Sequence, residues 1–442
     1  MAAVDGLISG LDTKTVISQL MALEGRPQKA LEATQAKARG DALNYRAVNT
    51  RFDSIRQAAE ALNKADSFVA TKASSSASSV AASATPGAAP GTRTFAVTAV
   101  TATHAIIGGT AFTATTDAYG NGDPLELTVG SGTPVSIALT ATDTLADVAT
   151  KINAGNHGVS AMVVKTAAGY QLEVTSKTTG TAGAFTLTKN GAAIGPVVTQ
   201  ASDAKIKIGT GPGAYEMTST SNTFADVLPG LSLTVSAVDP LTQVTVTVAE
   251  DPGAVAAKMK TLVDAANEAL STMKAFTDVK SATGRLNGDA TLRGLSTAVL
   301  DAVSSAIGGN NSAGSVGVQL SRTGTLTFDS AKFTAALAAD PTLARRIAVG
   351  EPGAPGIAAR LESVAKAASD PQTGSLTNMA KAKDDTATEL QTRIDAWDLR
   401  LEQRRASLNK TYASLETALG KLQSQSNWLS GQLANLPSWS SK

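Results

Sequence analysis

The feature that most constrains the fold is a set of apolar residues near the C-terminus that recurs every seven positions without a break. We call this set the C-terminal seam, and its members are Ile394, Leu401, Leu408, Leu415, Leu422, Leu429 and Leu436. A strict seven-residue repeat on a helix places all its members on one stripe, which packs against a partner helix with a left-handed supercoil. Because full burial of one Leu stabilises a protein by roughly 1.5–3 kcal/mol, a stripe of this length needs a partner surface.

A shorter stripe with the same spacing lies near the N-terminus, in a helix predicted to begin at about Pro27. Its apolar residues are Tyr45, Val48, Phe52, Ile55, Ala59 and Leu62. No other stripe in the sequence is comparable, so we predict that the N- and C-terminal helices pack together. The apolar residues beside the C-terminal seam change sides, from Leu390 and Trp397 to Tyr412, Leu419 and Leu433. This change predicts two successive partners, such as a helix of the same chain and then a neighbouring subunit.

The middle of the chain changes to an apolar period of two, with β-branched residues between turn residues, which is typical of antiparallel strands. The predicted strands are Thr94–Val100, Leu125–Val129, Tyr170–Thr175, Lys205–Ile208, Leu231–Val238 and Gln243–Ala249. A short helix, capped by Asp143 or Thr144, is predicted to interrupt them, with Leu145, Val148, Ala149 and Ile152 on its apolar face.

The sequence therefore predicts an α+β multidomain protein. A helical coiled-coil leg is formed by the N- and C-terminal segments, and antiparallel β-rich domains are inserted between them. We place the N-terminal leg at 1–70, a Ser-, Ala-, Gly- and Pro-rich linker at 71–93, the β-rich domains at 94–248, helical segments with a small β-hairpin at 249–375, and the C-terminal leg at 376–442. The hairpin is predicted over Val318–Phe328, with its turn at Thr323-Gly324.

The composition excludes several kinds of chemistry. The 442 residues include 38 basic and 37 acidic ones, and this balance argues against a nucleic-acid partner. The chain has no cysteine, which excludes disulfides, thiolate catalysis and zinc–thiolate sites. Its two histidines, His104 and His157, are 53 residues apart, and we expect both at the surface. We therefore predict a structural or binding protein rather than an enzyme, with no cofactor and no metal.

Other motifs have a functional and a structural interpretation. The glycines of Gly209–Gly213 are typical of a phosphate loop or a hairpin turn, and the non-helical Tyr215–Thr220 that follows favours the turn. The acidic pairs Glu250-Asp251 and Asp384-Asp385 are possible metal ligands, but we expect both to cap helix starts. The basic run Arg400, Arg404, Arg405 and Lys410 is more typical of a solvated coiled-coil face than of a phosphate site. Trp428 and Trp439 make the C-terminal end either a docking segment or a plain helix end.

The N-terminal residues do not have the pattern of a cleaved leader, which needs a basic region followed by an apolar stretch. The longest uncharged run nearby, between Lys72 and Arg93, has Val80 as its one large aliphatic residue, so it does not predict a membrane span. We expect a soluble protein that either stays in the cytoplasm or is exported by a machine that does not need a leader.

Motifs along nearly the whole chain resemble one family. Gly6–Asp12 (GLISGLD) and Gln19–Pro27 (QLMALEGRP) resemble the opening of the bacterial flagellar filament cap proteins, the hook-associated protein 2 family. Four segments at about 125–190 resemble the β-module that flagellins and hook-associated proteins share. They are Leu145–Val148, Ile152-Asn153, Gly158–Ala161 and Leu172–Lys177. Five later segments resemble the C-terminal region of cap proteins. They are Leu228–Val235, Val244–Val248, Gly288–Arg293, Gly324–Asp329 and Ala336–Pro341. One local departure is Tyr412–Glu416, where relatives often have Phe and Met-Asp.

The resemblance implies a structural cap at the distal end of the flagellar filament, outside the cell, that retains exported flagellin and promotes its folding and polymerisation. It implies helical legs that contact the filament, a β-rich plate, and export through the flagellar type III channel without a cleaved leader. The implied partners are copies of the same chain in a ring, usually a pentamer, flagellin, hook-associated junction proteins and a flagellar export chaperone.

We expect the oligomer or filament contacts at Tyr45, Phe52, Ile55 and Leu62 and along the C-terminal seam. Alternative functions are those of a hook–filament junction protein or minor flagellin, a flagellum-tip adhesin that binds ligands through residues 94–248, and, least favoured, an enzyme.

Overall fold

The structure is a computed structural model that describes residues 12–280, 286–305 and 312–434. It divides the chain into two compact units, a helical one made from the residues up to Asn63 and from Ala256 onward, and a β-rich one over Lys64–Val255. Segments from the two ends of the chain thus build one unit, and the other is inserted between them. This arrangement confirms the predicted α+β multidomain fold.

The helical unit consists of long helices, short helices and two small hairpins. Its helices are α1 (Thr13–Glu24), α2 (Arg26–Asn63), α4 (Pro252–Thr277), α5 (Ala290–Ser304), α6 (Ser330–Ala339), α7 (Pro341–Ala348), α8 (Ile357–Ser369) and α9 (Ser375–Ala434). Its strands are β17 (Val318–Leu320), β18 (Leu326–Phe328), β19 (Gly350–Glu351) and β20 (Ala354–Pro355). The β17–β18 pair is the predicted hairpin, and Gly324 in its turn has a φ of +77°, which glycine adopts without strain.

Aspartate side chains begin several of these helices, as the sequence predicts for Asp251. Asp12 accepts a hydrogen bond from the Thr15 N–H at 3.0 Å, Asp329 from Lys332 at 2.9 Å, and Asp340 from Leu343 at 2.9 Å. At the start of α4, Asp251 accepts from the Ala254 N–H at 3.1 Å. Each carboxylate satisfies a backbone donor that has no partner inside its helix.

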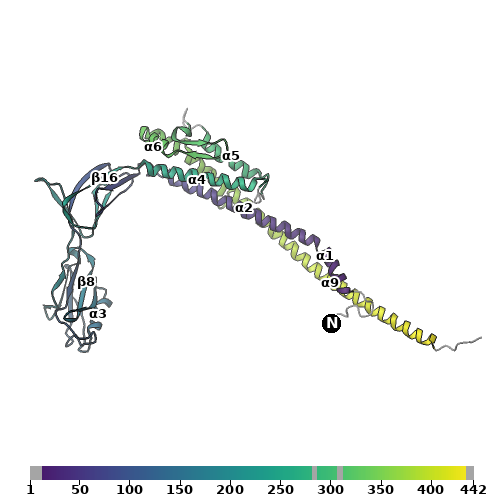
Figure 1. Ribbon diagram of the computed structural model, residues 1–442, viewed down its shortest axis with the longest axis horizontal. Coiled ribbons are helices and arrows are strands. Elements are labelled where there is room, and N and C mark those ends of the chain that lie inside the picture. The colour runs from purple at the N-terminus through teal and green to yellow at the C-terminus, as the bar shows by residue number, and fades with distance from the viewer. Residues whose placement is uncertain (1–11, 281–285, 306–311, 435–442) are drawn as a thin grey trace, which may run out of the picture. The chain divides into compact units, whose positions relative to one another are not determined.

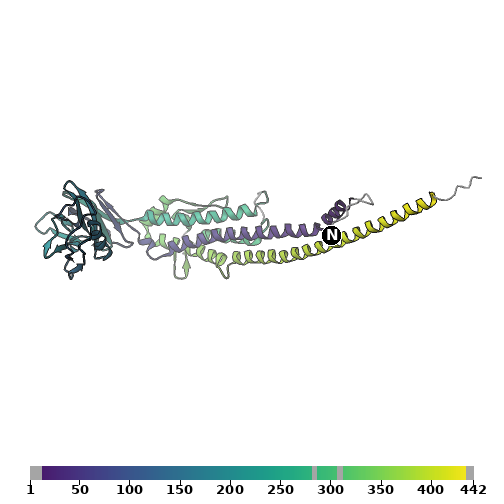
Figure 2. The same ribbon diagram turned by 90° about the horizontal axis from the view of Figure 1, so that it is seen from below.

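The helices α2 and α9 lie side by side in both views of the chain (Figures 1 and 2). Their polar contacts show that they run antiparallel, since Gln28 donates to Asp398, Gln35 to Gln391, and Lys383 lies 3.6 Å from Asp41. As residue numbers rise along α2, those of the partners fall along α9. The predicted packing of N- and C-terminal helices is therefore confirmed.

The first part of the β-rich unit is a pair of sheets around one apolar core. A five-stranded sheet has the order β1-β16-β3-β12-β13, and a three-stranded sheet has the order β14-β15-β2. Their shared core includes Phe95, Ile206, Leu231, Leu233 and Val246. The strands are β1 (Thr71–Ser75), β2 (Val80–Ala84), β3 (Gly91–Ala99), β12 (Ala204–Ile208), β13 (Tyr215–Ser219), β14 (Thr223–Leu228), β15 (Leu231–Val235) and β16 (Asp239–Glu250).

The second part contains two four-stranded sheets and the helix α3 (Leu145–Ala154). The sheet orders are β10-β9-β5-β6 and β11-β4-β8-β7. The strands are β4 (Thr103–Ile107), β5 (Leu125–Val129), β6 (Val135–Ile137), β7 (Val159–Thr166), β8 (Gly169–Thr179), β9 (Phe185–Lys189), β10 (Ala192–Ala193) and β11 (Val197–Thr199). Thr144 and Asp147 form a reciprocal capping box at the start of α3, and the predicted apolar face of this helix joins the core. All six predicted strands and the short helix are thus confirmed.

The prediction of a linker over residues 71–93 is wrong. This segment contains β1, β2 and the start of β3, and Val80 is 2% exposed. Thr71–Ser75 pairs with the end of β16, and Val80–Ala84 pairs with β15. Small Ser and Ala side chains are typical of a linker when only the local sequence is considered. The strands β15 and β16, far along the chain, supply the hydrogen bonds and the large apolar side chains that order this segment.

Candidate assembly interface

The N-terminal members of the predicted contact set lie inside the helical unit. Tyr45 is 3% exposed, and Phe52, Ile55 and Leu62 are fully buried. All four side chains are on α2, which packs against α9 and α8. Their contacts are therefore with helices of the same chain.

The C-terminal seam changes from buried to exposed along α9. Ile394 is 6% exposed, and Leu401 and Leu408 are half-buried. Beyond them, Leu415 is 44%, Leu422 60% and Leu429 54% exposed. Leu436 lies outside the described residues. The seam is therefore covered by its own chain over its first part and open over its described second part.

The helix α1 covers the part of the seam where exposure begins to rise. It packs along α9 with Ile17 and Met21 buried, and Glu24 forms an ion pair with Arg404 at 2.9 Å. A Cβ built on Gly25, between α1 and α2, would lie 3.9 Å from Leu401 Cδ1, so the chain passes close to the seam there. The structure describes α1 from Thr13, and residues 1–11, which include most of the Gly6–Asp12 motif, lie outside the described part.

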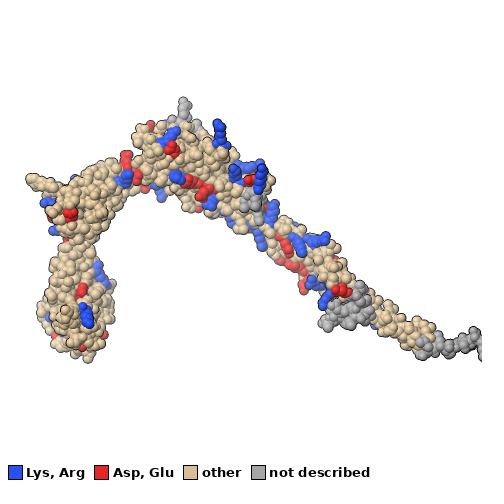
Figure 3. Space-filling model, in the orientation of Figure 1, with Lys and Arg blue, Asp and Glu red and all other residues tan. Residues whose placement is uncertain are grey.

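The number of charged side chains also falls along α9. Residues 385–409 include nine charged side chains, whereas residues 410–434 include three, namely Lys410, Glu416 and Lys421. Figure 3 shows the end of this helix almost without charged groups on the visible face. Trp428 and Leu433, both at least 60% exposed, lie in the same stretch. The open part of the seam is thus a row of exposed leucines on a helix surface with few charges, which favours association with another apolar stripe.

Polar contacts set the register of α2 against α9. The buried Gln35 amide donates to the Ala387 carbonyl at 3.1 Å and to Gln391 Oε1 at 2.7 Å. Asp41, 4% exposed, has one carboxylate oxygen 3.6 Å from Lys383 Nζ and the other without a hydrogen bond. A buried polar group costs free energy when it loses its partner, so these pairs disfavour sliding of one helix along the other. Sequence periodicity marks neither residue, because polar side chains do not contribute to an apolar stripe.

The expected role of Asp384-Asp385 at a helix start is wrong. Both residues lie well inside α9, which begins at Ser375, and Asp384 forms an ion pair with Arg46 of α2. Both side chains of this pair are substantially exposed, so the pair contributes little to stability. The acidic side chain near the true start of α9 is Asp370, which accepts hydrogen bonds from the Gln372 and Thr373 N–H groups at 2.9 and 2.8 Å.

Tyr45 joins α2 to the start of α5. Its hydroxyl donates to Asp289 Oδ2, while Asp289 Oδ1 accepts from the Leu292 N–H at 2.9 Å and caps α5. Burial, followed by the hydrogen bond to the Asp289 carboxylate, raises the pKa of Tyr45. One aspartate therefore begins a helix and fixes a second one beside it. The sequence places Tyr45 on an apolar stripe but does not indicate Asp289 as its partner.

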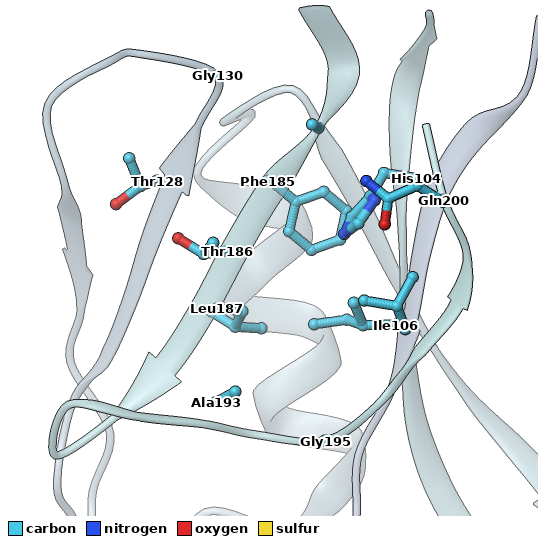
Figure 4. A pocket seen from close by; sticks show the side chains of 12 residues that line it. His104, Ile106, Thr128, Gly130, Phe185, Thr186, Leu187, Ala193, Gly195 and Gln200 are labelled. Atoms are coloured by element: carbon cyan, nitrogen blue, oxygen red, sulfur yellow. The ribbon is translucent and has the colours of Figure 1, made fainter. Parts of the chain in front are cut away.

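The β-rich unit contains an open cavity of about 360 Å³ between its two four-stranded sheets (Figure 4). His104 and Phe185 line one end, with Gln200 beside them, and Ile106 and Leu187 line the floor. His104 is the only titratable side chain among the lining residues, so the cavity has no acid–base pair.

The expected surface position of His104 is wrong, whereas His157 is half-buried. His104 is 4% exposed, its ring meets that of Phe185 edge-on at 4.8 Å, and its Nδ1 accepts the Ala201 N–H at 3.4 Å. The residues after β11 fold over this histidine, and that return of the chain is not visible in the local sequence.

The remaining candidate sites have structural roles. Gly209–Gly213 joins the antiparallel strands β12 and β13, which confirms the hairpin turn. Arg400 stacks over the Trp397 ring at 4.6 Å, and Arg404 pairs with Glu24. Within residues 12–280, 286–305 and 312–434, no group of three or more His, Asp or Glu side chains is placed to hold a metal ion. Among the helices of that described part, none is long and apolar enough to cross a membrane.

Comparison with known proteins identifies similar sequences and folds over most of the chain. The family models described as Flagellar hook-associated protein 2 N-terminus and C-terminus match residues 9–104 and 201–424, and the Flagellin hook IN motif matches residues 125–178. The chain is 25% identical to flagellar hook-associated protein 2 of Escherichia coli (strain K12), over 97% of both proteins. It is 26% identical to the B-type flagellar hook-associated protein 2 of Pseudomonas aeruginosa, over 100% of both.

A solved structure has a similar fold. The crystal structure of the D1-D2-D3 domains of the flagellar cap protein FliD from Escherichia coli matches with a TM-score of 0.62 at 24% identity. The match covers 77% of this chain and 99% of that chain. At this level of identity, the likeness shows a shared fold.

Proposed function

The chain belongs to the flagellar hook-associated protein 2 family, and on that premise we propose that it is a structural cap at the distal end of a bacterial flagellar filament. In this role it retains exported flagellin and promotes the folding and polymerisation of flagellin as the filament grows. The observation that carries the proposal is the open part of the C-terminal seam, where Leu415, Leu422 and Leu429 are between 44% and 60% exposed.

The open part of the seam is the contact surface in this proposal. Its seven-residue period continues that of the packed part of the seam. A partner helix that packs on α9 beyond the part covered by α1 therefore contacts the same stripe of side chains. Each Leu that remains about half exposed leaves roughly 1 kcal/mol of burial free energy to be gained on association. A cap must release and rebind as subunits are added, and several weak apolar contacts suit this cycle better than fixed ion pairs.

The partners that we propose follow from the same role. They are further copies of this chain in a ring, with five copies as the expected number, flagellin, the hook-associated junction proteins, and an export chaperone. We also propose export through the flagellar channel without a cleaved leader, to a position outside the cell at the flagellum tip. A chain without cysteine suits passage in an unfolded state, because no disulfide has to form or break on the way. The role requires binding and no bond chemistry, so we propose no enzymatic activity.

The test is complementation of a strain from which the gene has been deleted. We expect the deletion strain to release flagellin into the medium and to show short or absent filaments by electron microscopy, and the wild-type protein to restore capped filaments. Leu429→Arg places a charge on the open seam and should fail to restore growth while the β-rich unit remains folded. Leu241→Arg is the matched control, because Leu241 is a 93% exposed leucine in the β-rich unit.

The results separate the proposed cap from the other functions. Normal filament growth in the deletion strain would refute the cap function itself. Normal growth with Leu429→Arg would instead refute the role of the open seam. A deletion strain with full-length filaments that no longer attach to surfaces would favour an adhesin.

A further inference from the structure

The strand β7 (Val159–Thr166) lies at the edge of its sheet, with β8 on one side. The Lys177 N–H of β8 donates to the Gly158 carbonyl at 2.8 Å. In an antiparallel pair such bonds alternate along the strand, so even-numbered residues of β7 direct their backbone groups toward β8. Odd-numbered residues direct theirs to the open side. An open edge of this length is a template for another strand.

The side chain of Asn153 occupies part of this open edge. Its Oδ1 accepts the Ala161 N–H at 2.8 Å, and its Nδ2 donates to the Ala161 carbonyl at 2.7 Å. The carboxamide therefore supplies the acceptor and the donor that a neighbouring strand would supply. Asn153 is in the last turn of α3, and its neighbour Ile152 is fully buried in the core.

The other half of the edge has no such hydrogen-bonding partner, although α3 packs beside β7. Val163 and Lys165 also direct their backbone groups outward, and within the described part of the chain no hydrogen bond to those groups is present. The strand is rich in β-branched and apolar residues, which favour strand pairing. The contact of Asn153 with Ala161 is therefore what interrupts the edge near its middle.

The same device occurs at a second place in the chain. Asn267 of α4 accepts the Leu326 N–H of β18 at 2.8 Å and donates to the Leu326 carbonyl at 2.8 Å. There it joins a helix to a strand of three residues, which is too short an edge to pair stably. Loss of Asn267 would remove the same two hydrogen bonds without opening a long edge.

We propose that Asn153 acts as a strand surrogate that prevents β7 of one copy from pairing, antiparallel, with β7 of a second copy. The simplest such pair is two-fold symmetric and sets Ala161 of each copy opposite Val163 of the other. Because Asn153 occupies the Ala161 N–H and carbonyl, this register is unavailable while the side chain is in place. The alternative is that Asn153 only ties the end of α3 to the start of β7.

A unique cysteine distinguishes these roles, since the natural chain has none. Met162 is 51% exposed, and in the proposed register it faces Met162 of the second copy in a pair without mutual hydrogen bonds. Such pairs have Cα atoms about 4.5 Å apart, a distance that a disulfide spans. In the full-length M162C chain, we expect Asn153→Ala to raise the rate of cross-linking between copies by about tenfold or more, the equivalent of one or two released hydrogen bonds.

Two further variants serve as controls. Asn267→Ala in the M162C chain should lower stability without raising cross-linking. Lys165→Pro, added to Asn153→Ala, should return cross-linking to the starting rate, because the Lys165 N–H points away from β8 and its loss breaks no bond within the sheet.

Equal cross-linking with and without Asn153, together with a loss of stability like that of Asn267→Ala, would show that Asn153 is only a structural tie. If Asn153→Ala does not fold, Asn153→Ser replaces it, since the serine side chain is polar but lacks the carboxamide that bonds both the Ala161 N–H and its carbonyl. A folded Asn153→Ser chain that cross-links no faster than the parent would also overturn the proposal.

Discussion

Truncation of seam residues should separate folding of the chain from its assembly. Ile394 is 6% exposed and packs inside the helical unit, whereas Leu415, Leu422 and Leu429 are 44%, 60% and 54% exposed on the same stripe of α9. Ile394→Ala therefore removes a contact within the chain. A triple change of the three leucines to Ala removes apolar surface that the chain itself leaves open.

The magnitudes follow from burial. Ile394→Ala should lower the free energy of unfolding of the helical unit by about 2–5 kcal/mol, as buried Ile and Leu truncations do. The triple variant should change it by less than about 0.5 kcal/mol per site, since the sites are exposed and Ala is a better helix former than Leu. In association, the three leucines together should lose about 3 kcal/mol, which is roughly a hundredfold in the dissociation constant.

The assay has two parts. Unfolding of the helical unit is followed by far-UV circular dichroism in denaturant, at a protein concentration low enough that association does not add to stability. Association is measured by sedimentation velocity over a concentration series, with the wild-type chain, Ile394→Ala and the triple variant side by side.

Either of two results would refute this reasoning. If the triple variant unfolds as easily as Ile394→Ala, then the end of the seam is buried within the chain in solution. If it associates as strongly as the wild type, then the open seam is not an assembly surface, whatever its exposure.

Two other expectations concern pH. The Lys151 ammonium and the Thr140 N–H lower the pKa of Asp143. The contribution of Asp143 to stability is therefore complete above the unfolded pKa of about 4 and is lost as pH falls through the lower folded value. Asp143→Asn should destabilise the β-rich unit at neutral pH, and the difference from the wild type should vanish by about pH 2 in acid unfolding curves. A difference of the same size at both pH values would contradict this. The pKa of Tyr45 is raised above its usual value of about 10, so the contribution of Tyr45 to stability is complete below pH 10 and is lost as pH rises further. Tyr45→Phe should therefore lower stability at neutral pH but remove part of the stability that the wild-type chain loses in alkali. Unfolding in denaturant between about pH 8 and 12 measures both effects. Identical alkaline profiles for both chains would argue that the hydroxyl has no such role.

Local sequence predicts the elements that depend on local chemistry. The cap at Asp251 and the reciprocal cap of α3 are present because a side-chain oxygen satisfies a backbone donor a few residues away. The strands with a period of two are present for a related reason, because alternation fits a sheet with one buried face. No distant partner has to be known for either prediction.

The errors arise where distant residues decide the structure. The Ser- and Ala-rich segment at 71–93 is ordered by β15 and β16, and His104 is covered by the chain after β11. Asp384 lies inside α9 because nothing near it ends or begins a helix, although the acidic pair alone is typical of a cap. In each case the local residues are compatible with two structures, and long-range contacts select one.

The C-terminal seam shows most clearly which features the sequence determines and which depend on the tertiary structure. Its seven-residue period is a property of the sequence, and that period by itself determines one long helix with one apolar stripe and a need for helical partners. Only the tertiary structure decides where the partner within the chain stops. The helices α2 and α1 cover Ile394 and partly cover Leu401 and Leu408, and leave Leu415, Leu422 and Leu429 open. A seven-residue repeat specifies which face of a helix is apolar at every turn. How much of that face is covered depends on how the other segments pack beside the helix, and no local period in the sequence contains this information.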